Sequence, residues 1–378
     1  MLDPEARALL DLMDQANKAG RPKLESLPHA VGRAAVDKMS EDSEADPPEV
    51  AAVVDGTLPG PGGEIRFRRY RPLGTTAGLL PTLIYYHGGG FVIGNIETHD
   101  STCRRLANKS RCQVISIDYR LSPEHPFPAP LDDGIAAFRH IRDKAAPFEV
   151  DRERIAVGGD SAGGAVAAVV CQACRDAGEQ MPAFQMLIYP ATDSSKRSAS
   201  RTAFAEGYFL TGSLMEWFWK AYVPANTDLS DLRLSPLLAK DFKGLPPAFV
   251  LTAGFDPLRD EGRAYAFFGT PTGLPIAPSW STEGNQANAN WGCSLKGAGD
   301  VNGDGYSDVV VGARGYSNGQ TGEGRAASGP VAAFADAPRG ALLVAPGELQ
   351  AALGASIDAP ARLIRIRRRR GRLGGGDG

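Results

Sequence analysis

The sequence lacks the features that would place the protein in a membrane or outside the cell. No run of apolar residues reaches the roughly 18 needed to span a bilayer. Residues Met1–Gly20 are acidic and amphipathic, without a basic start or an apolar centre, so no signal peptide is predicted. The five cysteines are scattered and odd in number, which argues against a disulfide framework and for a reducing compartment. These absences predict a cytoplasmic protein that has no membrane partner.

The chain as a whole also lacks a strong charge of one sign. It carries 41 Lys and Arg against 44 Asp and Glu, so we expect no nucleic-acid partner for the whole chain. Positive charge gathers only in the low-complexity tail, residues 327–378, where residues 362–372 hold seven arginines. We expect this tail to be disordered, as from a GC-rich alternative reading frame. A nucleic-acid-binding tail is the functional alternative.

Histidine is scarce, and its placement limits the chemistry that the chain can perform. The five histidines are His29, His87, His99, His125 and His140, and all of them precede Ser161. Histidine is the side chain that most often takes up a proton near neutral pH. No imidazole is therefore available anywhere after His140.

The sequence does contain a regular alternation of short apolar runs and amphipathic stretches. Apolar runs predict buried strands at residues 83–86, 114–118, 154–158, 184–189 and 248–253. Two earlier stretches, residues 50–57 and 64–71, are predicted to be strands joined by a Pro/Gly turn. Helices are predicted between the later strands. The alternation predicts an α/β domain over residues 51–266, with a mostly parallel sheet covered by helices on both faces.

Residues 1–50 are predicted to form a helical region of their own. Leu9, Leu10, Leu12 and Met13 recur at roughly helical spacing within residues 3–18. The acidic, Pro-containing stretch 38–49 predicts a mobile connection to the α/β domain.

A serine flanked by glycines marks the end of one predicted strand. Gly159-Asp160-Ser161-Ala162-Gly163 follows the apolar run Ile155–Val157 and precedes a run of small apolar residues that predicts a buried helix. A strand, a sharp turn that bears a serine and then a helix is the context of a nucleophile elbow. The turn leaves room only for small neighbours, and the helix N-terminus supplies free N–H groups where an oxyanion would form.

Five stretches together resemble the hormone-sensitive-lipase-like carboxylesterases of the α/β-hydrolase fold. They occur in that family's order and at its approximate spacings, within residues 1–265. The stretches are Tyr86–Phe91, Asp118–Leu121, Pro123–Ala129, Gly159–Gly164 and Asp256–Glu261. The resemblance implies an α/β-hydrolase domain with an N-terminal helical cap over residues 1–50, helped by residues 196–226. It also implies a small-molecule ester substrate and no cofactor for hydrolysis.

Within this resemblance, most of a serine hydrolase's catalytic groups have a counterpart. Ser161 is the expected nucleophile. Gly88 and Gly89 follow a predicted strand, and their N–H groups would form the oxyanion hole together with that of Ala162. Asp256 stands where the family carries the residue that orients the catalytic histidine. It could equally be the N-cap of a helix that begins at Pro257, or serve as both.

The catalytic histidine itself is missing. In the family it follows the aspartate by roughly thirty residues, on the loop after the last strand. Here residues 283–288 read Glu-Gly-Asn-Gln-Ala-Asn, and none of these side chains is a base near neutral pH. The last strand and the final helix of the sheet are also predicted to be absent. The sequence therefore predicts a carboxylesterase by descent that is impaired in activity.

Residues 267–326 resemble the FG-GAP repeat of integrin-type β-propellers and are expected to be β-rich. Carboxylates and an amide alternate there so that they could converge on one hard cation, such as calcium. These residues are Asp300, Asn302, Asp304 and Asp308. A Gly/Asp-rich hairpin without an ion is the alternative, and a single repeat cannot bury its faces without neighbours.

The tetrapeptide Glu-Gly-Arg-Ala occurs at residues 261–264 and again at 323–326. We interpret this short identity as a join, near residues 262–266, between two unrelated coding sequences, formed by recombination or by sequence assembly. The alternative to an impaired esterase is therefore a chimeric or non-catalytic protein with a calcium-binding repeat. The sequence does not predict the oligomeric state.

Overall fold

The computed structural model describes residues 2, 4–43, 46–75, 77–194, 198–239 and 242–261. Beyond these it describes only the backbone of five short strands within residues 265–330. The statements on side chains below concern the first set of residues.

A seven-stranded sheet forms the centre of the molecule, in the order β1-β2-β4-β3-β5-β6-β7. Its first two strands are an antiparallel hairpin, and β2 is also antiparallel to β4. All later pairs are parallel, which confirms the predicted mostly parallel sheet. The strands are β1 Ala52–Gly60, β2 Gly63–Arg71, β3 Leu80–Tyr86, β4 Gln113–Asp118, β5 Val150–Asp160, β6 Phe184–Ile188 and β7 Ala248–Leu251.

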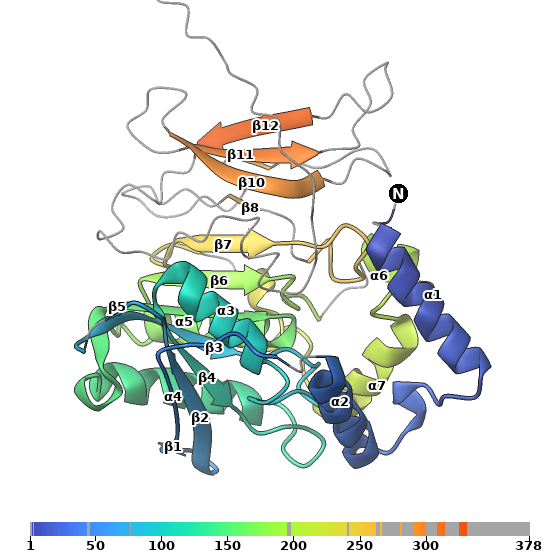
Figure 1. Cartoon of the computed structure of the whole chain (residues 1–378), viewed down its shortest axis with the longest axis horizontal. Coiled ribbons are helices and arrows are strands. Elements are labelled where there is room, and N and C mark those ends of the chain that lie inside the picture. Colours follow the sequence, from blue (N-terminus) through green and yellow to red (C-terminus); the bar gives the residue numbers. More distant parts are fainter. Residues whose placement is uncertain are drawn as a thin grey trace, which may run out of the picture.

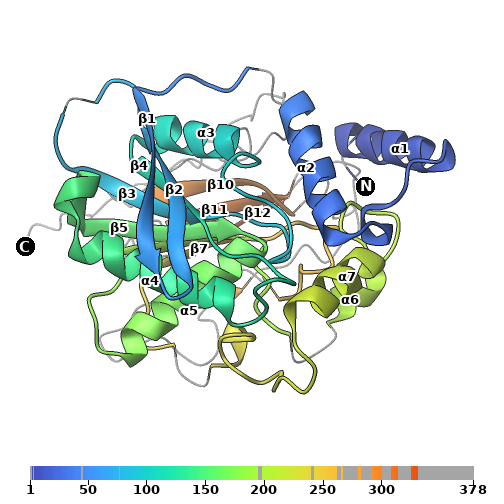
Figure 2. The ribbon, with the colours of Figure 1, turned by 90° about the horizontal axis from the view of Figure 1, so that it is seen from below.

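Helices cover both faces of this sheet, as predicted. Figure 2 shows α3 (Asp100–Ser110) on one side and α4 (Ala129–Asp143) and α5 (Ala162–Asp176) on the other. Each face has its own apolar core, because α3 contributes Leu106 to one cluster of buried side chains while α4 and α5 contribute Phe138 and Val166 to another. Short 3-10 helices lie in the connections, at Ala146–Phe148 and Pro236–Leu238.

Helix α5 lies deepest in the structure. Twelve of its 15 residues are buried, in keeping with its run of small apolar side chains. Cys171 and Cys174 are among them, and both are free thiols. They pack as small apolar side chains rather than as a redox pair.

The N-terminal helices form a cap at one side of the sheet, together with two later helices. Figures 1 and 2 both place α1 (Pro4–Lys18) and α2 (His29–Ser43) beside α6 (Ala199–Ala203) and α7 (Gly212–Tyr222). A 3-10 helix at Leu24–Ser26 joins α1 to α2. The cap is therefore built from both segments that the resemblance implied.

One prediction for this region is wrong in part. The stretch 38–49 was expected to be a mobile connection, but its first six residues, 38–43, are the last turns of α2. The i,i+4 ion pair between Lys38 and Asp42, at 2.8 Å, lies on these turns and favours the helix. The acidic composition that suggested a loop is the exposed face of the helix.

The C-terminal strands are described by their backbone alone. Three of them form an antiparallel sheet: β10 (Trp291–Gly299), β11 (Asp308–Ala313) and β12 (Arg325–Pro330). Two short strands, β8 (Tyr265–Ala266) and β9 (Trp280–Ser281), pair with each other. Asp308 begins β11, whereas Asp300, Asn302 and Asp304 lie outside the described residues, as do residues 331–378. The domain boundaries and the calcium loop stay predictions.

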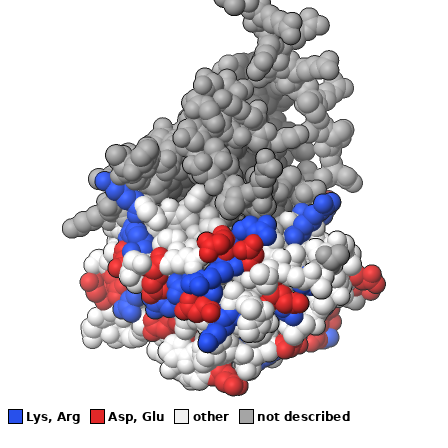
Figure 3. Space-filling view, turned by 90° about the vertical axis from the view of Figure 1, so that its left-hand side faces the viewer, with Lys and Arg blue, Asp and Glu red and all other residues white. Residues whose placement is uncertain are grey.

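The face drawn in Figure 3 shows no field of one charge over its described part. In Figure 3, basic and acidic side chains alternate across the described part of the face that is shown. Many charged side chains of the described residues form ion pairs, as Arg139 does with Glu179 at 2.7 Å. Among the described helices, none is long and apolar enough to cross a bilayer.

The contact between α4 and α5 gives a test of the core packing. A Cβ at Gly134 would overlap Val166 Cγ1, so Gly134→Ala should lower the free energy of unfolding by about 1–3 kcal/mol despite the better helix propensity of alanine. Gly212→Ala is the control, because the nearest atom to its new Cβ is Ala205 Cβ at 3.4 Å. Urea unfolding of both variants measures the difference. Equal stabilities would contradict the packing described here.

Candidate active site

Ser161 stands at the sharp turn between β5 and α5. Its backbone has φ 53° and ψ −115°, a conformation that costs a non-glycine residue on the order of 1–3 kcal/mol. The turn is held because Ser161 N–H donates to Ile188 O at 2.8 Å. A Cβ at Gly159 or at Gly163 would overlap Tyr86 O, so both flanking glycines are required by close backbone approach. The predicted elbow is present in this geometry.

The loop after β3, residues 87–90, lies against this turn. Gly163 lies so close to Tyr86 and His87 that a Cβ added to it would overlap the carbonyl oxygens of both residues. Gly89 and Gly90 have φ values of +116° and +59°, which glycine adopts at little cost. In the described part of the chain, their N–H groups donate to no other residue. Ala162 is the first residue of α5, so its N–H also lies at a helix N-terminus.

The prediction for Gly88 needs correction. Its N–H donates to Asp160 Oδ1 at 2.9 Å and so is not free to bind a substrate oxygen. Gly90, which the sequence analysis did not select, has the free N–H instead. Three consecutive glycines gave no local signal to decide which two would be donors. The deciding partner, Asp160, comes 72 residues later in the chain.

His87 is a structural residue. Its ring stacks on Tyr119 at 4.2 Å, and Tyr119 OH donates to His87 O. Its Nδ1 lies 2.8 Å from Gly88 O, to which it donates. Burial, together with the nearby His99, lowers the pKa of His87 to about 3. This imidazole is therefore neutral and fixed in the core.

The other four histidines also lie away from a catalytic role. His29 stacks on Trp217 of the cap, and His140 meets Phe148 edge-on. His125 is exposed, and His99 pairs with Asp160. None of them hydrogen-bonds Ser161 Oγ, which has no such partner among the described residues.

Asp256 lies in a turn after β7. Its Oδ1 accepts the Leu258 N–H at 2.8 Å, and burial raises the pKa of its carboxyl. The Asp160 and Asp256 carboxylates both raise the pKa of the buried Tyr189 phenol, after burial itself, which places that phenol near both. The Asp256 turn follows β7, which is separated from β5 by β6 in the sheet.

Contacts with α6 hold the Asp256 turn in place. Ser200 Oγ donates to Pro257 O at 2.7 Å, and Ser200 N–H donates to Asp260 Oδ2 at 2.9 Å. Arg201 forms an ion pair with Glu261, whose side chain is almost fully buried. The sequence analysis placed Pro257, Asp260 and Glu261 in a matching motif, but it gave no sign that side chains of α6 would bind that motif.

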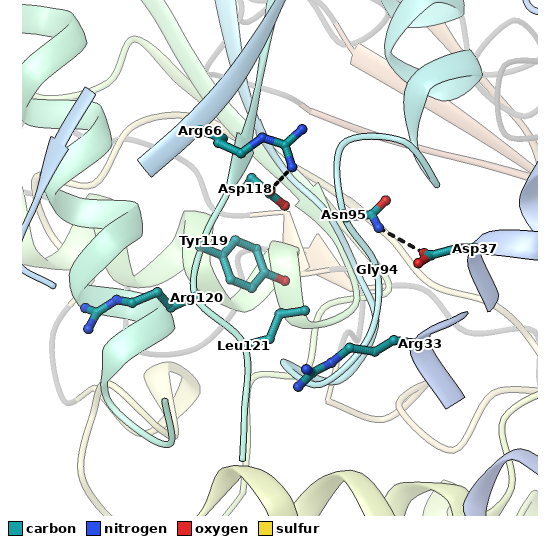
Figure 4. A pocket seen from close by; sticks show the side chains of 9 residues that line it. All are labelled: Arg33, Asp37, Arg66, Gly94, Asn95, Asp118, Tyr119, Arg120 and Leu121. Atoms are coloured by element: carbon teal, nitrogen blue, oxygen red, sulfur yellow. Dashed lines mark hydrogen bonds and ion pairs between the residues drawn. The ribbon is translucent and has the colours of Figure 1, made fainter. Parts of the chain in front are cut away.

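A polar cleft of about 300 Å³ lies apart from Ser161, between α2 and the core. Figure 4 shows its lining, with Arg33 and Asp37 from α2 facing Arg66 of β2 and the segment after β4. The guanidinium groups are already paired, as Arg66 is with Asp118 at 3.1 Å. The stretch Asp118–Leu121, which the sequence matched to the family, therefore builds this cleft and supports His87 rather than touching Ser161.

Comparisons with known proteins agree with this geometry. The family model described as alpha/beta hydrolase fold matches residues 83–268, and the FG-GAP repeat model matches residues 297–328. A crystal structure of an alpha/beta hydrolase enzyme from the metagenome of Lake Arreo, Spain, is 82% identical, with a TM-score of 0.69. That match covers 70% of this chain and 84% of the Lake Arreo chain.

Curated relatives point to the same family. The ethyl acetate hydrolase of Pseudomonas putida is 35% identical over 70% of this chain and 85% of its own length. The carboxylic ester hydrolase LipN of Mycobacterium tuberculosis is 48% identical, but the match spans 57% of this chain and 58% of LipN. The chain therefore spans less than two thirds of some of its curated relatives. The fold and the elbow define an α/β hydrolase. The chain belongs to the family of these carboxylesterases.

Asp118 gives a test of the cleft's electrostatics. Burial raises its pKa from 3.8 to about 6, although Arg66 opposes the shift. Between these pH values the folded state binds more protons than the unfolded state, so the stability that Asp118 contributes falls as pH rises through 6. As the pH rises from about 4 to 7, the wild type should therefore lose stability relative to Asp118→Asn. The difference between their free energies of unfolding should change by up to about 3 kcal/mol.

Asp143→Asn is the matched control, because the hydrogen bond from Arg142 lowers the pKa of Asp143. Asp143 is ionised in both the folded and the unfolded state above about pH 5, so its difference from the wild type should stay nearly constant from there to pH 7 and should shrink only as the pH falls below about 4. Urea unfolding at several pH values measures both. A difference for Asp118→Asn that does not vary with pH would contradict the described burial.

Proposed function

We propose that this protein is a carboxylic ester hydrolase that acts on short-chain acyl esters through a serine acyl-enzyme. The observation that carries the proposal is the strained elbow at Ser161, which adjoins the N–H groups of Gly89 and Gly90, and these donate to no residue in the described part of the chain. The relatives support it, since the Lake Arreo enzyme was solved as a Ser161Ala mutant and others are named ester hydrolases. No cofactor is needed for this chemistry.

In the proposed mechanism, Ser161 Oγ attacks the carbonyl carbon of the ester. The carbonyl oxygen becomes an oxyanion, which the N–H groups of Gly89, Gly90 and Ala162 stabilise. The C–O bond to the alcohol then breaks, the alcohol leaves with a proton, and water hydrolyses the acyl-serine.

The step that this chain performs poorly is removal of the Ser161 proton. None of its five histidines lies beside Ser161 Oγ, so Asp256 has no imidazole to orient. Loss of one member of a triad costs on the order of 10⁴ to 10⁶ in turnover, and the oxyanion hole retains a part of the rate enhancement. We therefore propose that hydrolysis is slow and depends on hydroxide from solvent.

Hydrolysis of p-nitrophenyl butyrate tests this proposal. Turnover should fall on the order of 10⁴-fold or more below that of an intact triad, and Ser161→Ala should abolish what is left. Turnover at ordinary esterase rates that is lost in Ser161→Ala would contradict the proposed impairment. Residual turnover that Ser161→Ala leaves unchanged would instead overturn the acyl-enzyme.

A second candidate function is favoured by the match to the FG-GAP repeat at residues 297–328. In this reading the chain is a chimeric or non-catalytic protein, joined near residues 262–266, whose repeat binds calcium. The proposed ligands are Asp300, Asn302, Asp304 and Asp308. Sequencing of the gene across codons 259–268 on an unbroken molecule tests the join.

Calcium binding has its own test. Millimolar calcium should raise the melting temperature, because an ion that binds only the folded state stabilises it by mass action. Asp304→Ala should remove the rise. Magnesium at the same concentration serves as the control, and an unchanged melting temperature in calcium would count against the second candidate.

A further inference from the structure

Asp160 is a buried carboxylate that directly precedes Ser161. It is the last residue of β5, and only 13% of its side chain is exposed. Its Oδ1 accepts from Tyr85 OH at 2.7 Å and from Gly88 N–H at 2.9 Å. His99 Nε2 lies 3.5 Å from the same oxygen. One carboxylate thus contacts the end of β3, the loop that follows it and His99, all of which lie far from Asp160 in the sequence.

The second oxygen of Asp160 also touches the loop after β3. A Cβ at Gly88 would overlap Asp160 Oδ2, so the carboxylate occupies the space of the missing side chain. Gly88 is therefore held through its N–H and through close contact with its α-carbon. The two partnerless N–H groups, those of Gly89 and Gly90, are the next two along the chain.

The charge of Asp160 strengthens this contact. Burial pushes the pKa of Asp160 upward, but His99 and the Tyr85 hydroxyl push it further downward, so that the net pKa lies below the usual value. Hydrogen bonds to an ionised acceptor are roughly twice as strong as neutral ones. His99 is oriented towards this carboxylate, and Thr98 Oγ1 lies 2.9 Å from its other ring nitrogen.

We propose that Asp160 is a positioning residue that fixes the Gly89 and Gly90 N–H groups relative to Ser161, with His99 as its counter-charge. The Asp160 backbone is joined directly to Ser161, and the Asp160 carboxylate binds the loop whose N–H groups would form the oxyanion hole. The two halves of the site therefore move as one unit. This inference rests on the proposed function, because it gives those N–H groups an oxyanion to bind.

A purely structural role is the competing interpretation. Asp133 allows the comparison, because it is also a fully buried carboxylate, paired with Arg120 at 2.8 Å. Asp133 makes no contact with residues 87–90 among the described residues. Asp133→Asn should therefore lower the melting temperature without changing the reactivity of Ser161.

The experiment measures covalent labelling of Ser161 in the full chain by an alkyl fluorophosphonate. Ser161 Oγ, having lost its proton, forms a bond to phosphorus as the P–F bond breaks and fluoride leaves, and the phosphonyl oxygen takes the place of the oxyanion. Labelling is followed by mass spectrometry at about pH 9, where hydroxide takes the Ser161 proton. Saturation kinetics give the maximal rate constant, kinact, and the half-saturating concentration, KI. Ser161→Ala is the blank.

Asp160→Ala should lower kinact by about 10²-fold with KI unchanged, which is the scale on which loss of one oxyanion donor acts. Asp160→Asn keeps an acceptor oxygen for the Gly88 N–H and should retain kinact within about tenfold. Asp133→Asn should keep the wild-type kinact. If Asp160→Ala keeps the wild-type kinact, or if Asp133→Asn loses as much, the inference is overturned.

Hydrogen exchange separates the inference from the proposed function. The peptide that spans residues 86–94 should exchange its amides faster in Asp160→Ala, and in Asp160→Asn if the alanine variant does not fold. Unchanged exchange in the folded Asp160 variant would overturn the positioning role. A wild type that shows no labelling of Ser161 would overturn the proposed function alone, since the exchange result still decides the positioning role.

Discussion

The structure depends on a close approach of backbone between the end of β3 and the turn that carries Ser161. Gly159 and Gly163 both lie against the carbonyl oxygen of Tyr86, where a single added carbon would not fit. This contact brings together the last residue of β3, the end of β5 and the start of α5. No side chain separates these three backbone segments. For that reason the loop after β3 lies beside Ser161 and the N-terminus of α5.

Polar groups in the core then fix the orientation of what the backbone has brought together. Asp160 holds the loop from the side of the elbow, and Tyr119 holds it from the other side through the ring and the carbonyl of His87. These groups are buried and hydrogen-bonded, so each would be costly to disrupt. The elbow and the loop after β3 are thus held in one fixed arrangement, which is the arrangement that the proposed function uses.

The sequence was sufficient to predict the α/β fold, the approximate positions of the strands in the seven-stranded sheet and the elbow, because these features have local patterns of apolar residues and glycine. It selected the N–H group of Gly88 as an oxyanion donor, whereas the structure pairs this group with Asp160, a contact that no local pattern reveals. The last turns of α2 were missed for a related reason, because acidic residues suit an exposed helix as well as a loop. Contacts between distant segments, such as that of His99 with Asp160, follow from the topology of the sheet and not from spacing along the chain.

The burial of α5 has a consequence for how the site responds to heat. Twelve of the 15 residues of this helix are packed in the core, and Ser161 stands directly before its first residue. The helix cannot shift or fray at that end without opening the core of the domain. The geometry at the serine is therefore expected to persist up to the unfolding transition and to vanish with it, as one cooperative event rather than a gradual loosening.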